Sequence, residues 1–79
     1  MSTIVLRIPK AAVSMQTGII TEWLVEDGAV ITEGQPIYNL EIEKTAVEIE
    51  APASGVLRQI AAAGESYSVG KIIGEILNE

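Results

Sequence analysis

The chain has 79 residues, of which eleven are Asp or Glu, five are Lys or Arg, and none is Cys or His. A net charge of −6 disfavours nucleic acid and anionic membranes as partners, because both select for clustered basic side chains. Without Cys or His the chain can form no disulfide, catalytic triad or common zinc or haem site, so carboxylate, lysine, hydroxyl and backbone chemistry remain.

Length and composition predict a single small domain over residues 1–79, with 48% hydrophobic residues available for its core. No apolar stretch approaches the ~20 residues of a membrane span. The N-terminus also lacks a basic segment followed by an apolar signal region. We therefore expect a cytoplasmic protein, in a bacterium rather than in a mitochondrial matrix.

Six apolar runs rich in Ile, Val and Thr follow one another along the chain, separated by glycines and prolines. They predict short β-strands, because β-branched side chains favour a pleated backbone. The runs are residues 3–8, 18–25, 36–42, 46–51, 56–60 and 72–77. Residues 61–63 lean towards helix, but Gly64 ends this stretch too soon for a stable one. The pattern predicts an all-β sandwich or barrel.

The two halves of the chain resemble each other. Gly28, Gly34 and Ile37 recur 36 positions later as Gly64, Gly70 and Ile73, and residues 18–20 recur 37 positions later as 55–57. Such a repeat predicts two similar sheet halves that close over one core. The alternative is chance, since glycines mark turns in any β protein.

The segment 38–51 carries the most information, because its apolar residues fall on even positions before Lys44 and on odd positions after Thr45. This change of parity predicts a tight β-hairpin with one apolar face. A turn at residues 43–44 would oppose Leu40 with Val47, whereas a turn at residues 44–45 would oppose Ile42 with Val47. Both registers place Lys44 in the turn.

Lys44 stands among glutamates that we expect to point to solvent, namely Glu41, Glu43, Glu48 and Glu50. Alternating strand positions do not converge on a cation as a calcium loop does, so a solvated acidic face is favoured. The tip lacks the Asn-Gly or Asp-Gly of a common hairpin turn, so turn chemistry does not account for Lys44. A lysine at a tip can enter another protein's active site, although it can also be merely solvated or guard against edge pairing.

At these residues the chain resembles a lipoyl domain of the 2-oxo acid dehydrogenase complexes. The matching residues are Ile8-Pro9-Lys10, Ser14-Met15, Gly18-Ile19-Ile20, Trp23-Leu24-Val25, Asp27-Gly28, Val30, Gly34, Pro36-Ile37, Glu41-Ile42-Glu43-Lys44-Thr45 and Ala51-Pro52-Ala53-Ser54-Gly55. The resemblance implies a flattened barrel of two antiparallel sheets related by a quasi-two-fold axis. It also implies that Lys44 carries lipoic acid as an amide, and that Glu41 and Gly55 are recognised by the lipoylating enzyme.

The chain departs from the family pattern on both sides of the lysine. Glu43 stands where Asp is more common and Thr45 where Ala is more common, so both residues bear on recognition by the ligase. The alternative is a biotinyl domain, which shares the fold but brackets its lysine with methionines. The two methionines here, Met1 and Met15, are remote from Lys44 in sequence, which favours lipoate.

The resemblance implies a monomeric carrier domain of a multienzyme acyltransferase complex that is not itself catalytic. Its implied partners are a lipoate ligase or lipoyltransferase, a thiamine-diphosphate dehydrogenase that reductively acylates the lipoyl group, an acyltransferase core and a flavoprotein dihydrolipoamide dehydrogenase. The substrate is a 2-oxo acid or acetoin. The dithiolane supplies the sulfur chemistry that the polypeptide lacks. The third hypothesis, besides the lipoyl and biotinyl domains, is an unmodified barrel that acts as an interaction module.

Trp23 and the loop of residues 9–17 give two further predictions. Trp23 lies among apolar neighbours and is expected in the core, where its indole N–H needs a hydrogen-bond partner. By the resemblance, the loop of residues 9–17 lies beside the hairpin tip and helps a partner enzyme recognise its carrier. The alternative for this loop is an ordinary connection.

Overall fold

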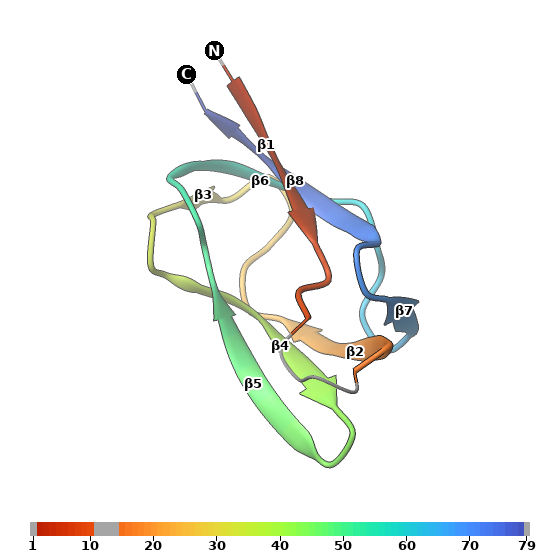
Figure 1. Cartoon of the computed structure of the whole chain (residues 1–79). Helices are drawn as coiled ribbons and strands as arrows, with labels where there is room; N and C mark the ends of the chain where they lie inside the picture. The colour runs from red at the N-terminus through yellow and green to blue at the C-terminus, as the bar shows by residue number, and fades with distance from the viewer. Residues whose placement is uncertain (1, 11–14, 79) are drawn as a thin grey trace.

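The computed structural model describes residues 2–10 and 15–78, which form eight β-strands and no helix (Figure 1). The strands are β1 (Ser2–Arg7), β2 (Thr17–Trp23), β3 (Val30–Ile31), β4 (Pro36–Ile42), β5 (Thr45–Glu50), β6 (Gly55–Gln59), β7 (Ser66–Ser68) and β8 (Ile72–Asn78). Each of the six apolar runs became a strand. The two short strands β3 and β7 were not predicted, because they have only two and three residues.

The strands form two four-stranded sheets in which every pairing is antiparallel. The terminal sheet has the order β1-β8-β6-β3, and the hairpin sheet has the order β5-β4-β2-β7. The two orders correspond strand by strand, with β8, β6 and β3 in the places of β4, β2 and β7. The predicted sandwich of two similar antiparallel sheets is therefore confirmed.

The internal repeat extends to backbone detail. Gly28 and Gly64 have φ angles of 88° and 89°, and Gly34 and Gly70 repeat the same two values. Both sheets also contain a register shift at equivalent positions, so that Ile37 of β4 has no partner in β5 and Ile73 of β8 has no partner in β1. Both isoleucines are fully buried. The repeat in the sequence thus records two structurally equivalent halves around one core.

Trp23 lies at the margin of that core. Its indole N–H donates a hydrogen bond of 3.0 Å to the carbonyl oxygen of Ala61, and its ring centroid lies 5.2 Å from that of the buried Tyr38. The expected hydrogen-bond partner is present. Trp23 itself is half-buried and packs against the core from one side, because its polar edge has to reach a loop carbonyl.

The molecule is elongated, with principal extents of 36 × 20 × 19 Å. Ser2 of β1 pairs with Asn78 of β8, so the two ends of the chain lie side by side. Figure 1 shows these ends at one pole of the molecule and the β4–β5 turn at the other. The described part of the chain contains no helix with the length and apolarity needed to cross a membrane.

Candidate functional site

The β4–β5 hairpin has the first of the two predicted registers. Ile42 pairs with Thr45 and Leu40 pairs with Val47, so Glu43 and Lys44 are the two turn residues. Leu40 and Ile42 are buried, while Lys44 and Thr45 are exposed. The apolar face of the hairpin therefore packs on the core and holds the turn at the end of the molecule.

The turn requires an unusual backbone conformation. Glu43 has φ of 54°, and among the described residues it is the one non-glycine with a positive φ. This left-handed conformation costs about 1 kcal/mol for a residue with a Cβ. The strands on either side must supply that energy, because an Asn-Gly sequence, which accepts positive φ readily, is absent from the tip.

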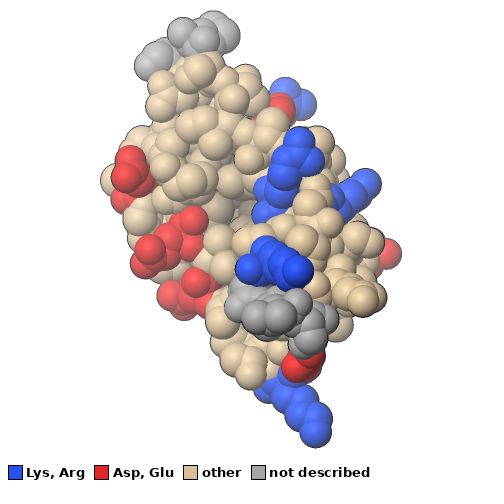
Figure 2. All heavy atoms as spheres, in the orientation of Figure 1, with Lys and Arg blue, Asp and Glu red and all other residues tan. Residues whose placement is uncertain are grey.

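The Lys44 side chain is free to react with a partner. It is exposed, and within the described residues no hydrogen bond or ion pair holds its ammonium group. Figure 2 shows the tip ending in a basic side chain that projects away from the body of the domain, with an acidic side chain beside it. A primary amine on a narrow turn can enter a recessed active site without a collision between the two proteins.

The glutamates of the hairpin differ in exposure. Glu43, Glu48 and Glu50 are exposed as expected, but Glu41 is half-buried. All four were expected to point to solvent, and Glu41 is less exposed than that expectation implies. Glu41 lies on β4 beside strand β2, where Ile19 is its direct cross-strand partner.

Acidic and basic side chains are unevenly distributed between the two sheets. The outer face of the hairpin sheet carries Glu22 and Glu48 in one cross-strand row with Asn39, and Glu41 in the next row. Four of the five basic residues lie on or next to strands of the terminal sheet, namely Arg7, Lys10, Arg58 and Lys71. Figure 2 shows several acidic side chains along the left of this view and most of the basic side chains on the right, where single acidic side chains also lie. Lys44 is thus the one basic residue of the hairpin sheet.

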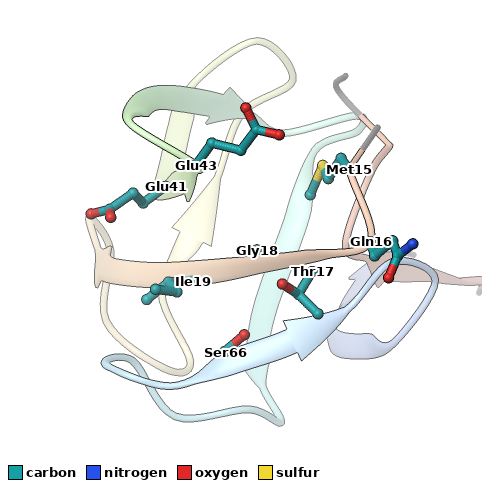
Figure 3. A pocket seen from close by; sticks show the side chains of 8 residues that line it. All are labelled: Met15, Gln16, Thr17, Gly18, Ile19, Glu41, Glu43 and Ser66. Carbon is teal, nitrogen blue, oxygen red and sulfur yellow. The ribbon is translucent and has the colours of Figure 1, made fainter. Parts of the chain in front are cut away.

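A hollow of ≈ 380 Å³ lies beside the tip (Figure 3). It is lined by residues 15–19, Glu41, Glu43 and Ser66. Residues 15–17 therefore lie next to the hairpin, as expected for the end of the 9–17 loop, while residues 11–14 fall outside the described residues. Ser66 was missed by sequence reasoning, since β7 is three residues long and carries no motif.

The sequence was compared with models of known protein families. A family model described as "Biotin-requiring enzyme" matches residues 4–76. The chain belongs to the biotin and lipoyl family. The match includes both sheets and the whole β4–β5 hairpin.

Several curated relatives of this family member are acyltransferase components from bacteria. The chain is 41% identical over 68 residues to the "Dihydrolipoyllysine-residue acetyltransferase component of acetoin cleaving system" of Cupriavidus necator, covering 85% of this chain and 18% of that protein. It is 36% identical over 72 residues to the corresponding succinyltransferase component of the 2-oxoglutarate dehydrogenase complex of Bacillus subtilis, covering 90% of this chain and 17% of that protein. It is 40% identical over 60 residues to the acetyltransferase component of the pyruvate dehydrogenase complex of Mycoplasma capricolum, covering 75% of this chain and 14% of that protein. The chain spans less than a fifth of the length of these relatives.

Within this biotin and lipoyl fold, Gly55 lies away from the tip. It begins β6 in the terminal sheet and pairs with Ile31 of β3, near the pole that carries the chain ends (Figure 1). A Cβ at this position would overlap the carbonyl oxygen of Leu77 and would lie 2.7 Å from Cγ2 of Ile76. Packing therefore explains the glycine, and its recognition by a lipoylating enzyme stays a prediction. Of the other predicted recognition residues, the structure brings Glu41, Glu43 and Thr45 together around Lys44.

Proposed function

We propose that this chain is a lipoyl carrier domain in which Nζ of Lys44 holds lipoic acid through an amide bond. The observation that carries the proposal is the hairpin register, which makes Lys44 an exposed residue of the turn. The names of the relatives, which refer to dihydrolipoyllysine residues, support lipoate as the attached group.

The residues of the tip suit this role. A lysine amine attacks a carboxyl group only in its neutral form, so the ligase has to remove a proton from Lys44 before the amide forms. When bound, the lipoyl group supplies a reactive disulfide. The polypeptide has no cysteine that could exchange with it. Glu41, Glu43 and Thr45 flank the lysine and are proposed as the surface that the ligase reads.

The proposed partners follow from the proposal that this chain is a lipoyl carrier domain. They are a lipoate ligase or lipoyltransferase, a thiamine-diphosphate dehydrogenase, an acyltransferase core and a flavoprotein dihydrolipoamide dehydrogenase. The relatives belong to acetoin, 2-oxoglutarate and pyruvate systems, so we propose a 2-oxo acid or acetoin as the substrate class. We propose a bacterial cytoplasmic location because these relatives are bacterial proteins.

Biotin is the competing cofactor, since the family includes both groups. Biotinyl domains bracket their lysine with methionines, whereas Glu43 and Thr45 flank Lys44 here. Met15 is 4% exposed and packs in the core cluster. This arrangement favours lipoate over biotin.

Intact-mass measurement after coexpression with a lipoate ligase, and separately with a biotin ligase, tests the proposal. We expect one lipoyl adduct on the wild-type chain and none on Lys44→Arg, which keeps the charge but cannot form the amide. A biotin adduct alone, or a lipoyl adduct that persists in Lys44→Arg, would overturn it. Glu41→Ala should lower the yield of lipoylation while leaving the thermal midpoint nearly unchanged, because Glu41 has no role in the core.

A further inference from the structure

The two sheets begin with equivalent edge strands, β1 in the terminal sheet and β5 in the hairpin sheet. Equivalent positions on these edges are identified by their pairing partners on β8 and β4, which differ by 36 residues. The equivalent pairs are Val5–Glu75 with Glu48–Asn39, and Arg7–Ile72 with Glu50–Pro36. Val5 and Arg7 therefore stand where the hairpin sheet has Glu48 and Glu50, and all four residues are exposed.

This difference leaves the edge of β1 less protected than the edge of β5. An edge strand presents unpaired backbone N–H and C=O groups, and charged side chains discourage another strand from pairing with them. Two glutamates protect β5 in this way, whereas residues 2–6 of β1 carry no charge and Val5 is 43% exposed. Among the described residues, β1 pairs with β8 alone, and no loop backbone forms a hydrogen bond with residues 2–7 (Figure 1). The second edge of β1 is therefore open to a further strand.

Three exposed basic residues lie at the end of this open edge, namely Arg7, Lys10 and Lys71, which we call the basic cluster. Nη1 of Arg7 donates a hydrogen bond of 3.0 Å to the carbonyl oxygen of Gly70, beside Lys71. The backbone N–H of Ile8 donates one of 3.0 Å to the carbonyl oxygen of Lys71, and Lys10 follows two residues later. Figure 2 shows most of the basic side chains on the right of its view. Within the described part of the chain, none of the three forms an ion pair, so their charge is available to a partner.

We propose that the open edge of β1 binds an extended segment of a partner protein by strand addition. In this mode backbone hydrogen bonds supply affinity, and side chains on alternate positions supply specificity. The partner segment carries carboxylates at the end that reaches the basic cluster, and uncharged side chains beside Val5. Carboxylates are excluded beside Val5 because its neighbour on β8 is Glu75, which already pairs with Arg58 at 3.6 Å. All pairings in the two sheets are antiparallel, so the acidic end of the segment is its N-terminal end.

A second copy of this chain fits the edge less well than an acidic segment does. Residues 2–7 contain no carboxylate, so the β1 strand of another copy could not neutralise the basic cluster. Both copies would also carry a net charge of −6. The edge belongs to the terminal sheet, whereas Lys44 lies in the turn of the hairpin sheet. The docking proposal is therefore independent of lipoylation and can be tested on the unmodified chain.

NMR titration of the isotope-labelled domain with a synthetic peptide tests the proposal. The peptide begins with a short run of aspartates and continues with alternating threonine and valine. We expect saturable amide shift changes in residues 2–7 and slower hydrogen exchange of their amides, because new backbone hydrogen bonds protect them. A peptide with lysines in place of the aspartates should bind more weakly. A peptide with the same aspartates but with prolines in place of the valines should fail to protect the amides, since proline cannot donate to the ladder.

Variants of the domain locate the binding site. Val5→Glu, which introduces the residue type of position 48, should abolish binding, and Thr3→Glu on the same edge replaces it if Val5→Glu does not give the dispersed spectrum of a folded domain. Arg7→Ala should raise the Kd about fivefold, the effect of one exposed ion pair. Lys44→Ala is the matched control, because it removes the same charge from the other sheet, and it should change the Kd by less than about twofold.

Four outcomes would overturn the proposal. The first is full binding by a folded Val5→Glu or Thr3→Glu variant, and the second is equal protection of the amides by the proline peptide. The third is equal affinity for the lysine peptide, because the basic cluster would then select nothing. The fourth is concentration-dependent sedimentation with the amides of residues 2–7 already protected in the absence of peptide, because a second copy would then occupy the edge.

Discussion

Replacement of Gly55 by alanine separates a packing role from a recognition role. The added Cβ would overlap the carbonyl oxygen of Leu77 and approach Cγ2 of Ile76 to 2.7 Å. The first of these contacts is with backbone, which cannot rotate away as a flexible side chain can. We therefore expect Gly55→Ala to weaken the terminal sheet where β6 meets β8.

The new contact sets the expected loss of stability. Inserting a methyl group into a closely packed site costs about 1–3 kcal/mol, and a backbone contact places Gly55→Ala at the upper end of this range. For a domain of 60–100 residues, a loss of about 3 kcal/mol lowers the thermal midpoint by roughly 12–24 °C. Gly28→Ala provides the matched control, because its φ is 88° but no atom lies within 4 Å of the added Cβ. That control should cost about 1 kcal/mol from backbone conformation alone.

Urea unfolding followed by the fluorescence of the single tryptophan measures both variants, and lipoylation is then scored by intact mass at a temperature where each is folded. We expect Gly55→Ala to be lipoylated normally once it is folded. A variant with wild-type stability that the ligase fails to modify would refute the packing explanation and support direct recognition of Gly55.

Three other perturbations test separate parts of the structure. Burial raises the pKa of Tyr38 to about 12 from an ordinary 10.0, so this tyrosine ionises first in the unfolded chain, and the free energy of unfolding should fall by about 2 kcal/mol as pH rises from 10 to 12. Alkaline unfolding that is unchanged in Tyr38→Phe would contradict this. Trp23→Phe removes the 3.0 Å hydrogen bond to Ala61 and should lower the free energy of unfolding, measured by circular dichroism, by about 2 kcal/mol. An unchanged free energy of unfolding would show that this hydrogen bond does not stabilise the fold. Arg58→Ala should change the free energy of unfolding by less than about 0.5 kcal/mol, because its 3.6 Å pair with Glu75 is at the surface and the arginine side chain is 62% exposed; a loss above 1 kcal/mol would indicate a larger network.

The sequence predicted those parts of the fold that depend on side-chain pattern. Apolar runs located six strands, and the 36-residue repeat predicted two equivalent sheets. The strands β3 and β7 were not predicted, because two or three residues are too few to show the alternation of a strand. The register shifts at Ile37 and Ile73 could not be predicted either. Such a shift allows consecutive residues of one strand to be buried, and it depends on the partner strand.

The candidate site was predicted to a similar extent. The parity of apolar residues placed Lys44 in the turn, but it could not choose the register, which depends on Glu43 accepting a positive φ. The half-burial of Glu41 and the contribution of Ser66 arise from the neighbouring strands β2 and β7. Contacts between segments so distant in the chain leave no local trace in the sequence.

The internal symmetry explains why the lysine and the chain ends are at opposite poles. By its place in the sheet order, β4 is equivalent to β8, and β5 is equivalent to β1. The turn that joins β4 to β5 is therefore equivalent to the gap between β8 and β1, where the chain is open. Adding the 36-residue offset to Lys44 leads just beyond the last residue, Glu79. A polypeptide attached at this gap would hold the domain by one pole, so the full 36 Å long axis would extend the reach of the lysine.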